Sequence, residues 1–140
     1  TKLTNAEIRD EIQQTNTVLT HITKQPIQYF RPPGGKLNTR VKRIVKSMGL
    51  KTVLWDVNPS DFTIQQNKLS IVGEGKGIKS QAQIEDHIYS NVQKGSIILL
   101  HNGGIETLSA LPNIIENLQE KGFNFVTLTQ LLKTENENIY

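Results

Sequence analysis

Apolar residues recur at helical spacing near the start of the chain. The positions that share this face are Ile8, Ile12, Thr15, Leu19 and Ile22. The preceding residues 4–7 (TNAE) have the form of a capping box, in which a Thr and a Glu side chain each bond the other's backbone N–H. Because proline disfavours the helical conformation in the residue before it, the helix is expected to end before Pro26. The pattern predicts one long amphipathic helix between the capping box and this proline.

Four short apolar segments, each long enough for one strand, are spread over the rest of the chain. The predicted strands are residues 27–30, 52–57, 96–100 and 123–128. The third is apolar enough to be covered on both faces. Residues 31–35 predict a sharp loop, and residues 58–79 predict a long connection with a weak strand-like run at 69–72.

Helical patterns lie between these strands. Asn38 is expected to cap one helix, which ends at Gly49 in a left-handed conformation. A second helix follows Ser80 and carries apolar residues up to Val92. A third is expected over residues 107–121, with Pro112 in its first regular turn, and a short one over residues 129–133.

Strands that alternate with helices are typical of α/β folds, in which parallel strands are joined by right-handed crossovers. In such folds the reactive groups lie beyond the carboxyl ends of the strands. Arg31, Asp61 and His101 each follow the end of a different predicted strand. These three residues are therefore the first candidates for chemistry.

The composition is that of an ordinary globular domain, with 36% apolar and 21% charged residues among 140. The 16 Lys and Arg exceed the 13 Asp and Glu by a net charge of +3, and the basic residues are scattered without interleaved aromatic residues. This distribution argues against nucleic acid as a partner. The absence of Cys excludes disulfides, thiolate metal sites and a Cys nucleophile. No apolar run approaches the roughly 20 residues of a transmembrane segment.

Each candidate residue has a functional and a purely structural interpretation. An apolar strand leads to His101 in a Gly-rich turn, where the imidazole could donate a proton near neutral pH or simply bond a loop carbonyl. Asp61 could hold that imidazole in one tautomer, or it could be a turn residue. Arg31 could pair with a catalytic carboxylate, or it could hold its own loop through a salt bridge.

Other candidate sites have weaker sequence signals. Trp55 and Phe62 could form a sugar-stacking surface, although a Trp within an apolar strand is commonly a core residue. The three His residues have no spacing typical of metal ligands. Glycines at 73, 75 and 77 leave a small nucleotide-binding domain open as an alternative, but Ile78 occupies the position of the third glycine in G-x-G-x-x-G.

Three of these segments together resemble the motifs of the polysaccharide deacetylase family, the NodB-homology domain of carbohydrate esterase family four. Residues 29–35 (YFRPPGG) resemble its Arg-x-Pro motif, and residues 55–62 (WDVNPSDF) resemble its Asp-x-x-Asp-Trp segment. Residues 98–101 (ILLH) resemble its Leu-x-Leu-His motif. The resemblance runs in matching order from about Thr4 to Lys133.

The resemblance implies a fold and a set of roles. The strands would be part of a (β/α) barrel, with residues 1–133 as the C-terminal portion of the domain and residues 134–140 as a polar tail. Arg31 would orient the carboxylate of a catalytic base, Asp61 would tune the catalytic His, and His101 would be the general acid. The substrate contacts would come from Leu100, in the pocket for the acetyl methyl group, and from Pro33, Phe62 and Trp55.

The chain departs from the family pattern in two positions and lacks two motifs. Asn58 stands where the family has Asp, and Phe62 stands where it usually has Trp, so the groove would differ in polarity and stacking. The Thr-Phe-Asp-Asp-Gly and His-[Ser/Thr]-x-x-His motifs, which supply the base and metal ligands in the family, are not in these 140 residues. We therefore expect the C-terminal part of such a domain, inactive alone.

The activity implied by the resemblance is metal-assisted removal of N-acetyl groups from amino-sugar polymers such as peptidoglycan, chitin oligomers or poly-N-acetylglucosamine. The divalent metal, expected to be zinc, would be bound by residues upstream of this chain, so the missing N-terminal part of the domain would be its partner. The setting would be extracellular or associated with the cell wall. The alternative is a metal-free carbohydrate-binding or scaffolding module derived from the same fold.

Overall fold

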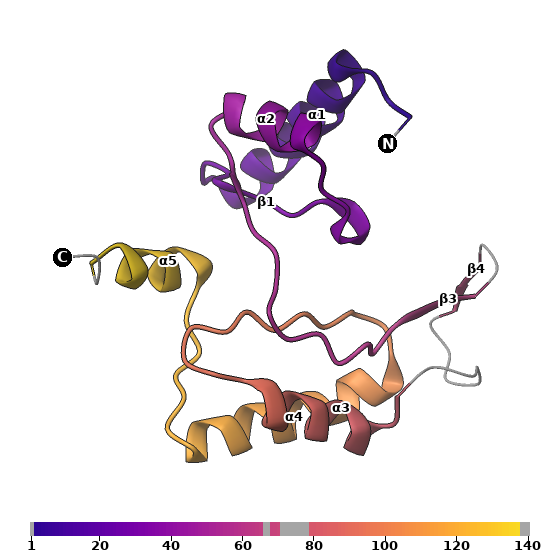
Figure 1. Cartoon of the computed structure of the whole chain (residues 1–140), viewed down its shortest axis with the longest axis vertical. Helices are drawn as coiled ribbons and strands as arrows, with labels where there is room; N and C mark the ends of the chain where they lie inside the picture. The colour runs from indigo at the N-terminus through magenta and orange to yellow at the C-terminus, as the bar shows by residue number, and fades with distance from the viewer. Residues whose placement is uncertain (1, 66–67, 71–78, 138–140) are drawn as a thin grey trace. The chain divides into compact units, whose positions relative to one another are not determined.

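The computed structural model describes residues 2–65, 68–70 and 79–137 of the chain (Figure 1). The chain divides into two compact units, Thr1–Leu54 and Trp55–Tyr140. Each unit has an apolar core of its own. No helix in the described part of the chain is long and apolar enough to cross a membrane.

The first unit begins with helix α1 (Asn5–Thr23), in agreement with the sequence pattern. The predicted capping box is present: Glu7 N donates to Thr4 Oγ1 at 3.3 Å, and Thr4 N donates to Glu7 Oε2 at 2.7 Å. The helix ends at Lys24, which has a left-handed backbone with a φ of 56°. The helix, its cap and its end before Pro26 are therefore confirmed.

The other elements of this unit are two short parallel strands joined by a helical crossover. They are β1 (Tyr29–Phe30), the 3-10 turn η1 (Pro33–Gly35), α2 (Thr39–Ser47) and β2 (Lys51–Thr52). Asn38 caps α2, and Gly49 follows the helix with a φ of 77°, as predicted. The buried core lies between α1, α2 and the residue before β2, and consists of Ile8, Ile12, Val41, Ile44, Val45 and Leu50.

The strand expected over residues 52–57 is divided between the two units. Thr52 belongs to β2, and Val53 N adds one bond to Phe30 O at 2.9 Å. Val57 instead forms an isolated parallel bridge with Ile98 in the second unit. An apolar run indicates an extended segment, but pairing depends on the partner segment, so the run alone could not locate this division.

The second unit contains a small hairpin and three helices. They are β3 (Thr63–Gln65), β4 (Lys68–Ser70), α3 (Gln81–Asn91), α4 (Ile105–Glu120) and α5 (Leu128–Glu137). Ser80 and Gln83 form a capping box at the start of α3, which confirms the predicted helix start. The core packs α3 against α4 beside the Val57 bridge, and its buried members are Val57, Ile84, Ile88, Ala110, Ile114 and Leu118.

The predictions for strands in the second unit were largely wrong. The strand-like run expected at 69–72 is confirmed in part by β4, but β4 pairs with β3 in an antiparallel hairpin, so the strands are not all parallel. The strand expected at 96–100 is reduced to the single bridge at Ile98. The strand expected at 123–128 does not form, since Leu128 begins α5 and both Phe125 and Val126 are 51% exposed. Apolar runs in this unit therefore overstated the extent of the sheet.

Two helices also differ from their predicted bounds. Helix α4 begins at Ile105, so Pro112 lies inside the helix and not in its first turn. An internal proline removes one backbone hydrogen bond, at a cost of about 3 kcal/mol, and the buried face of α4 offsets this cost. Helix α5 extends to Glu137, beyond the predicted end. The glycine-rich stretch at 73–77, on which the nucleotide alternative depended, lies outside the described residues.

Candidate active site

Two loops of the second unit begin at the bridge between Val57 and Ile98. Leu99 N donates to Val57 O at 2.9 Å and fixes the parallel pairing at this point. The chain continues past the bridge to Asp61 on one side and to His101 on the other. Because the two segments run in parallel, both residues lie beyond the same end of the pair.

Asp61 and His101 are joined by two hydrogen bonds. His101 Nδ1 lies 2.8 Å from Asp61 Oδ1, and the backbone N–H of His101 donates to Asp61 Oδ2 at 2.7 Å. The Asp61 side chain is fully buried, whereas the His101 side chain keeps 34% of its surface exposed. A buried carboxylate is costly unless donors surround its oxygens, so these bonds hold both side chains in place.

The loop before Asp61 is held by its own residues. Asn58 Oδ1 accepts a hydrogen bond from Ser60 N at 2.9 Å, and Pro59 is buried. Ser60 has a left-handed backbone with a φ of 56°, a conformation that costs a non-glycine residue about 1 kcal/mol. The Asn58 side chain therefore serves the turn that delivers Asp61 to His101.

Phe62 covers one face of the His101 ring. The two ring centroids lie 4.7 Å apart, and the ring planes differ by 21°, which is a stacked arrangement. The sequence predicted that Phe62 could stack on a sugar ring. In the structure its described ring contact is with the imidazole, so it limits the orientations that His101 can adopt.

The geometry of the pair decides which imidazole nitrogen can react. Because the Asp61 carboxylate only accepts hydrogen bonds, a neutral His101 carries its proton on Nδ1 and leaves the lone pair on Nε2. None of the described residues hydrogen-bonds Nε2. When the ring is protonated, the carboxylate stabilises the imidazolium, and Nε2–H becomes the free donor. The pair can therefore exchange a proton with a group that approaches Nε2.

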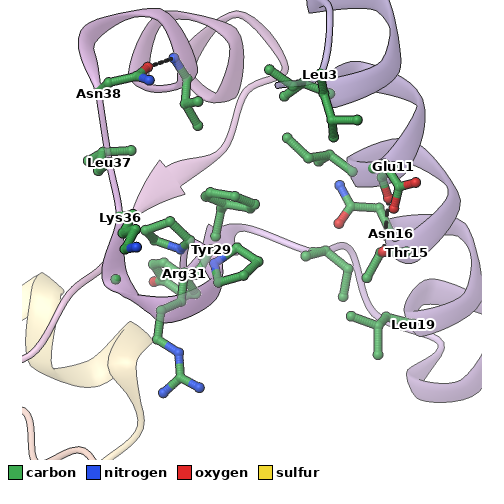
Figure 2. A pocket seen from close by; sticks show the side chains of 18 residues that line it. Leu3, Glu11, Thr15, Asn16, Leu19, Tyr29, Arg31, Lys36, Leu37 and Asn38 are labelled. Carbon is green, nitrogen blue, oxygen red and sulfur yellow. Dashed lines mark hydrogen bonds between the residues drawn. The ribbon is translucent and has the colours of Figure 1, made fainter. Parts of the chain in front are cut away.

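Arg31 and Pro33 belong to the first unit, in the loop that follows β1. Both are exposed and lie at the wall of an open, mostly apolar pocket of about 980 Å³ between α1 and residues 27–41 (Figure 2). In Figure 2 the Arg31 guanidinium extends away from the labelled side chains of α1. The structure thus brings Asp61 and His101 together and assigns Arg31 and Pro33 to the other unit.

The described residues offer no donor set for a metal ion. Within residues 2–65, 68–70 and 79–137, no three His, Asp or Glu side chains lie close enough together to bind one. His101 already uses Nδ1 on a carboxylate. A metal site therefore does not fit the donors present in this part of the chain.

Known proteins are similar in sequence to most of this chain. The family profile described as polysaccharide deacetylase matches residues 1–53. A peptidoglycan-N-acetylglucosamine deacetylase from Bacillus cereus is 36% identical over 115 residues, which are 79% of this chain and 47% of that protein. A peptidoglycan-N-acetylmuramic acid deacetylase from Bacillus subtilis is 29% identical over 133 residues, 94% of this chain and 46% of that protein.

The chain belongs to the polysaccharide deacetylase family. A solved structure agrees: a pseudoenzyme of carbohydrate esterase family 4 from Bacillus anthracis has a TM-score of 0.76 and 26% identity, covering 94% of this chain and 41% of that one. The resemblance seen in the sequence motifs is therefore confirmed. This polysaccharide deacetylase chain spans about half the length of the curated relatives it matches.

The remaining candidate residues of the polysaccharide deacetylase chain lie near its second core. Leu100 is half-buried and packs against the apolar cluster of α3 and α4, directly before His101. Trp55 is also half-buried, at the start of the second unit. Contact of either residue with a substrate stays a prediction.

Sequence reasoning missed one residue of the site. Thr107, in the first turn of α4, donates from Oγ1 to Asp61 Oδ2 at 2.9 Å and is buried. The signal was present in the helical pattern, because Thr107 shares the buried face of α4 with Ala110, Ile114 and Leu118. A hydroxyl on an otherwise apolar face indicates a buried hydrogen-bond partner.

Proposed function

We propose that this chain carries the proton-donating part of a deacetylase site that removes N-acetyl groups from amino-sugar polymers. The observation that carries the proposal is the pair of Asp61 and His101, with a buried carboxylate on Nδ1 and Nε2 on an exposed ring. Relatives named as deacetylases of peptidoglycan support an amino-sugar polymer as the substrate and a cell-wall or extracellular setting.

The reaction needs a proton donor at the amide nitrogen. Hydrolysis adds water to the carbonyl carbon, breaks its bond to nitrogen, and releases acetate and an amine. An amine anion is a very poor leaving group, so the nitrogen must be protonated as the bond breaks. His101 Nε2–H would supply this proton, while Asp61 keeps the ring oriented and stabilises the imidazolium before transfer.

The other half of the site would come from outside the described residues. A base must take a proton from the attacking water, and Arg31 would orient the carboxylate of this base. The divalent metal, expected to be zinc, would activate the water and the carbonyl when bound. We place the metal ligands, and the strands that would complete a (β/α) barrel, in an N-terminal part of the domain. The support for this placement is that the chain spans only about half the length of its relatives. Substrate contacts would come from Leu100, Pro33, Phe62 and Trp55.

Replacing the proposed acid tests this function. In the full gene product, His101→Gln should lower kcat for release of acetate from N-acetylglucosamine oligomers by roughly 10²- to 10⁴-fold with little change in KM, because a positioned acid contributes that much. His87→Gln, on α3 of the same unit, is the matched control and should keep full turnover. A folded His101→Gln protein with unchanged kcat would refute the acid role.

A metal-free carbohydrate-binding module is the second candidate function. It is supported by the similarity to a protein described as a pseudoenzyme and by Asn58 and Phe62, which depart from the family motif. Metal content and glycan binding of the full gene product distinguish the two candidates. Glycan binding that persists without metal and without turnover favours the module, whereas acetate release that disappears with a chelator and returns with zinc favours the enzyme.

A further inference from the structure

Three donors hydrogen-bond the Asp61 carboxylate, and each bonds a particular one of its two oxygens. Oδ1 faces only the His101 ring, at 2.8 Å from Nδ1. Oδ2 accepts both the backbone N–H of His101 at 2.7 Å and the Thr107 hydroxyl at 2.9 Å. Two donors on Oδ2 prevent the carboxylate from rotating about its last bond. This arrangement reserves Oδ1 for the imidazole.

The Thr107 hydroxyl has no other described partner in this buried place. Thr107 is 5% exposed and lies on the helix face that packs into the core. Burying a hydroxyl without a hydrogen bond costs about 1–3 kcal/mol, and Val has the same shape without that cost. A residue selected for packing alone would therefore be apolar at this position.

Gly104 keeps the space that the Thr107 hydroxyl occupies. It caps α4 with a φ of −81°, a conformation open to every residue, so backbone freedom does not explain the glycine. A Cβ at this position would lie 3.2 Å from Thr107 Oγ1, which is closer than an ordinary contact. The small cap residue and the buried hydroxyl thus form one arrangement around Asp61.

We propose that Thr107 is a positioning residue for His101, acting through Asp61, with Gly104 leaving the room that this contact needs. The proposal rests on the proposed function of His101 as the acid, and it adds a residue that never touches the substrate. Thr107 fixes the carboxylate, the carboxylate fixes the Nδ1–H tautomer, and the tautomer directs Nε2 towards the reacting group.

The test compares two variants of Thr107 by ¹⁵N NMR of the His101 ring in the full gene product. Thr107→Val keeps the shape but removes the hydroxyl. We expect the Nδ1–H proton to exchange with water about 10-fold faster, the factor that corresponds to one hydrogen bond, and the share of the Nδ1–H tautomer to fall. Thr107→Ser keeps the hydroxyl and should restore both signals.

One control and one further variant separate this role from a merely structural one. Thr127→Val removes a hydroxyl that bonds Gln130 in the same unit and should leave the His101 signals unchanged. Gly104→Ala keeps the hydroxyl but displaces it, so it should reproduce part of the Thr107→Val effect. If Thr107→Val does not fold, Thr107→Ser and Gly104→Ala decide the question. Unchanged His101 signals in folded Thr107→Val, or in Gly104→Ala where the Val variant is unfolded, would overturn the proposal.

Turnover of the full gene product gives an independent readout. Thr107→Val should lower kcat about 10-fold at constant KM, less than the loss expected for His101→Gln, and Thr107→Ser should recover most of it. If His101→Gln remains active, the proposed function fails while the NMR result still reports on Thr107. If only the NMR signals stay unchanged, the positioning role fails while the acid role stands.

Discussion

The two units of the chain differ in what they bury. The core of the first unit, between α1 and α2, is apolar. The side-chain hydrogen bonds of this unit include the helix caps formed by Thr4 and Asn38. The second unit buries Asp61 and Thr107 beside its apolar core. Their side-chain bonds connect residues 40 and 46 positions apart.

The first unit has an apolar core, whereas the second also buries a carboxylate that is hydrogen-bonded to a histidine. Apolar packing stabilises a helix pair through buried area and shape, without a directional bond to any one side chain. A buried carboxylate with three donors does specify orientation, because each unmet bond would cost about 1–3 kcal/mol. The second unit therefore carries the defined geometry, while Arg31 in the first unit lies exposed beside an open pocket.

The largest expected difference concerns the apolar cores themselves. Ile88→Ala in the second unit should lower the free energy of unfolding by about 4 kcal/mol, and Ile12→Ala in the first by about 2 kcal/mol. Ile88 has no exposed surface, whereas Ile12 is 7% exposed and lines the open pocket, where the surroundings can relax. Urea unfolding followed by circular dichroism, with Trp55 fluorescence for the second unit, measures both. Equal losses would contradict the contrast between the two cores.

The next effect concerns the buried carboxylate. Asp61→Asn should cost about 1–3 kcal/mol of unfolding free energy, because the amide NH₂ must face a donor that the carboxylate accepted. Asp56→Asn is the matched control: Asp56 is exposed and accepts one bond from Ile97 N, so we expect about 0.5 kcal/mol. If both variants lost the same stability, Asp61 would be no more than a turn residue.

The smallest effect is a pH dependence confined to the first unit. The backbone and side chain of Thr4 both bond the Glu7 carboxylate and lower the pKa of Glu7 from its ordinary value. A carboxyl group whose pKa is lowered by folding stabilises the folded state at pH values above its ordinary pKa. This stabilisation is lost as the pH falls through the lowered pKa. The first turn of α1 should therefore fray in acid, as measured by the Glu7 amide shift. Glu7→Gln should abolish this dependence, and Glu11→Gln should not.

Local chemistry made the helices predictable. The caps at Thr4, Asn38 and Ser80 each use a side chain within three residues of the N–H that it bonds, so the sequence alone shows them. Strands were less predictable, because a strand exists only where a second segment supplies its hydrogen bonds. Residues 123–128 have the composition of a strand and yet do not form one. The start of α4 was misplaced because burial of its apolar face overrides the effect of Pro112.

The sequence by itself determined the family, the caps that begin three of the helices, and the choice of Arg31, Asp61 and His101 as candidate residues. Only the tertiary structure decided that Asp61 and His101 meet, that Phe62 lies on the imidazole, and that Thr107 holds the second carboxylate oxygen. The physical reason is the range of the interactions involved. Caps and helical faces depend on neighbours in sequence, whereas a buried carboxylate takes its donors from whichever segments the fold brings beside it.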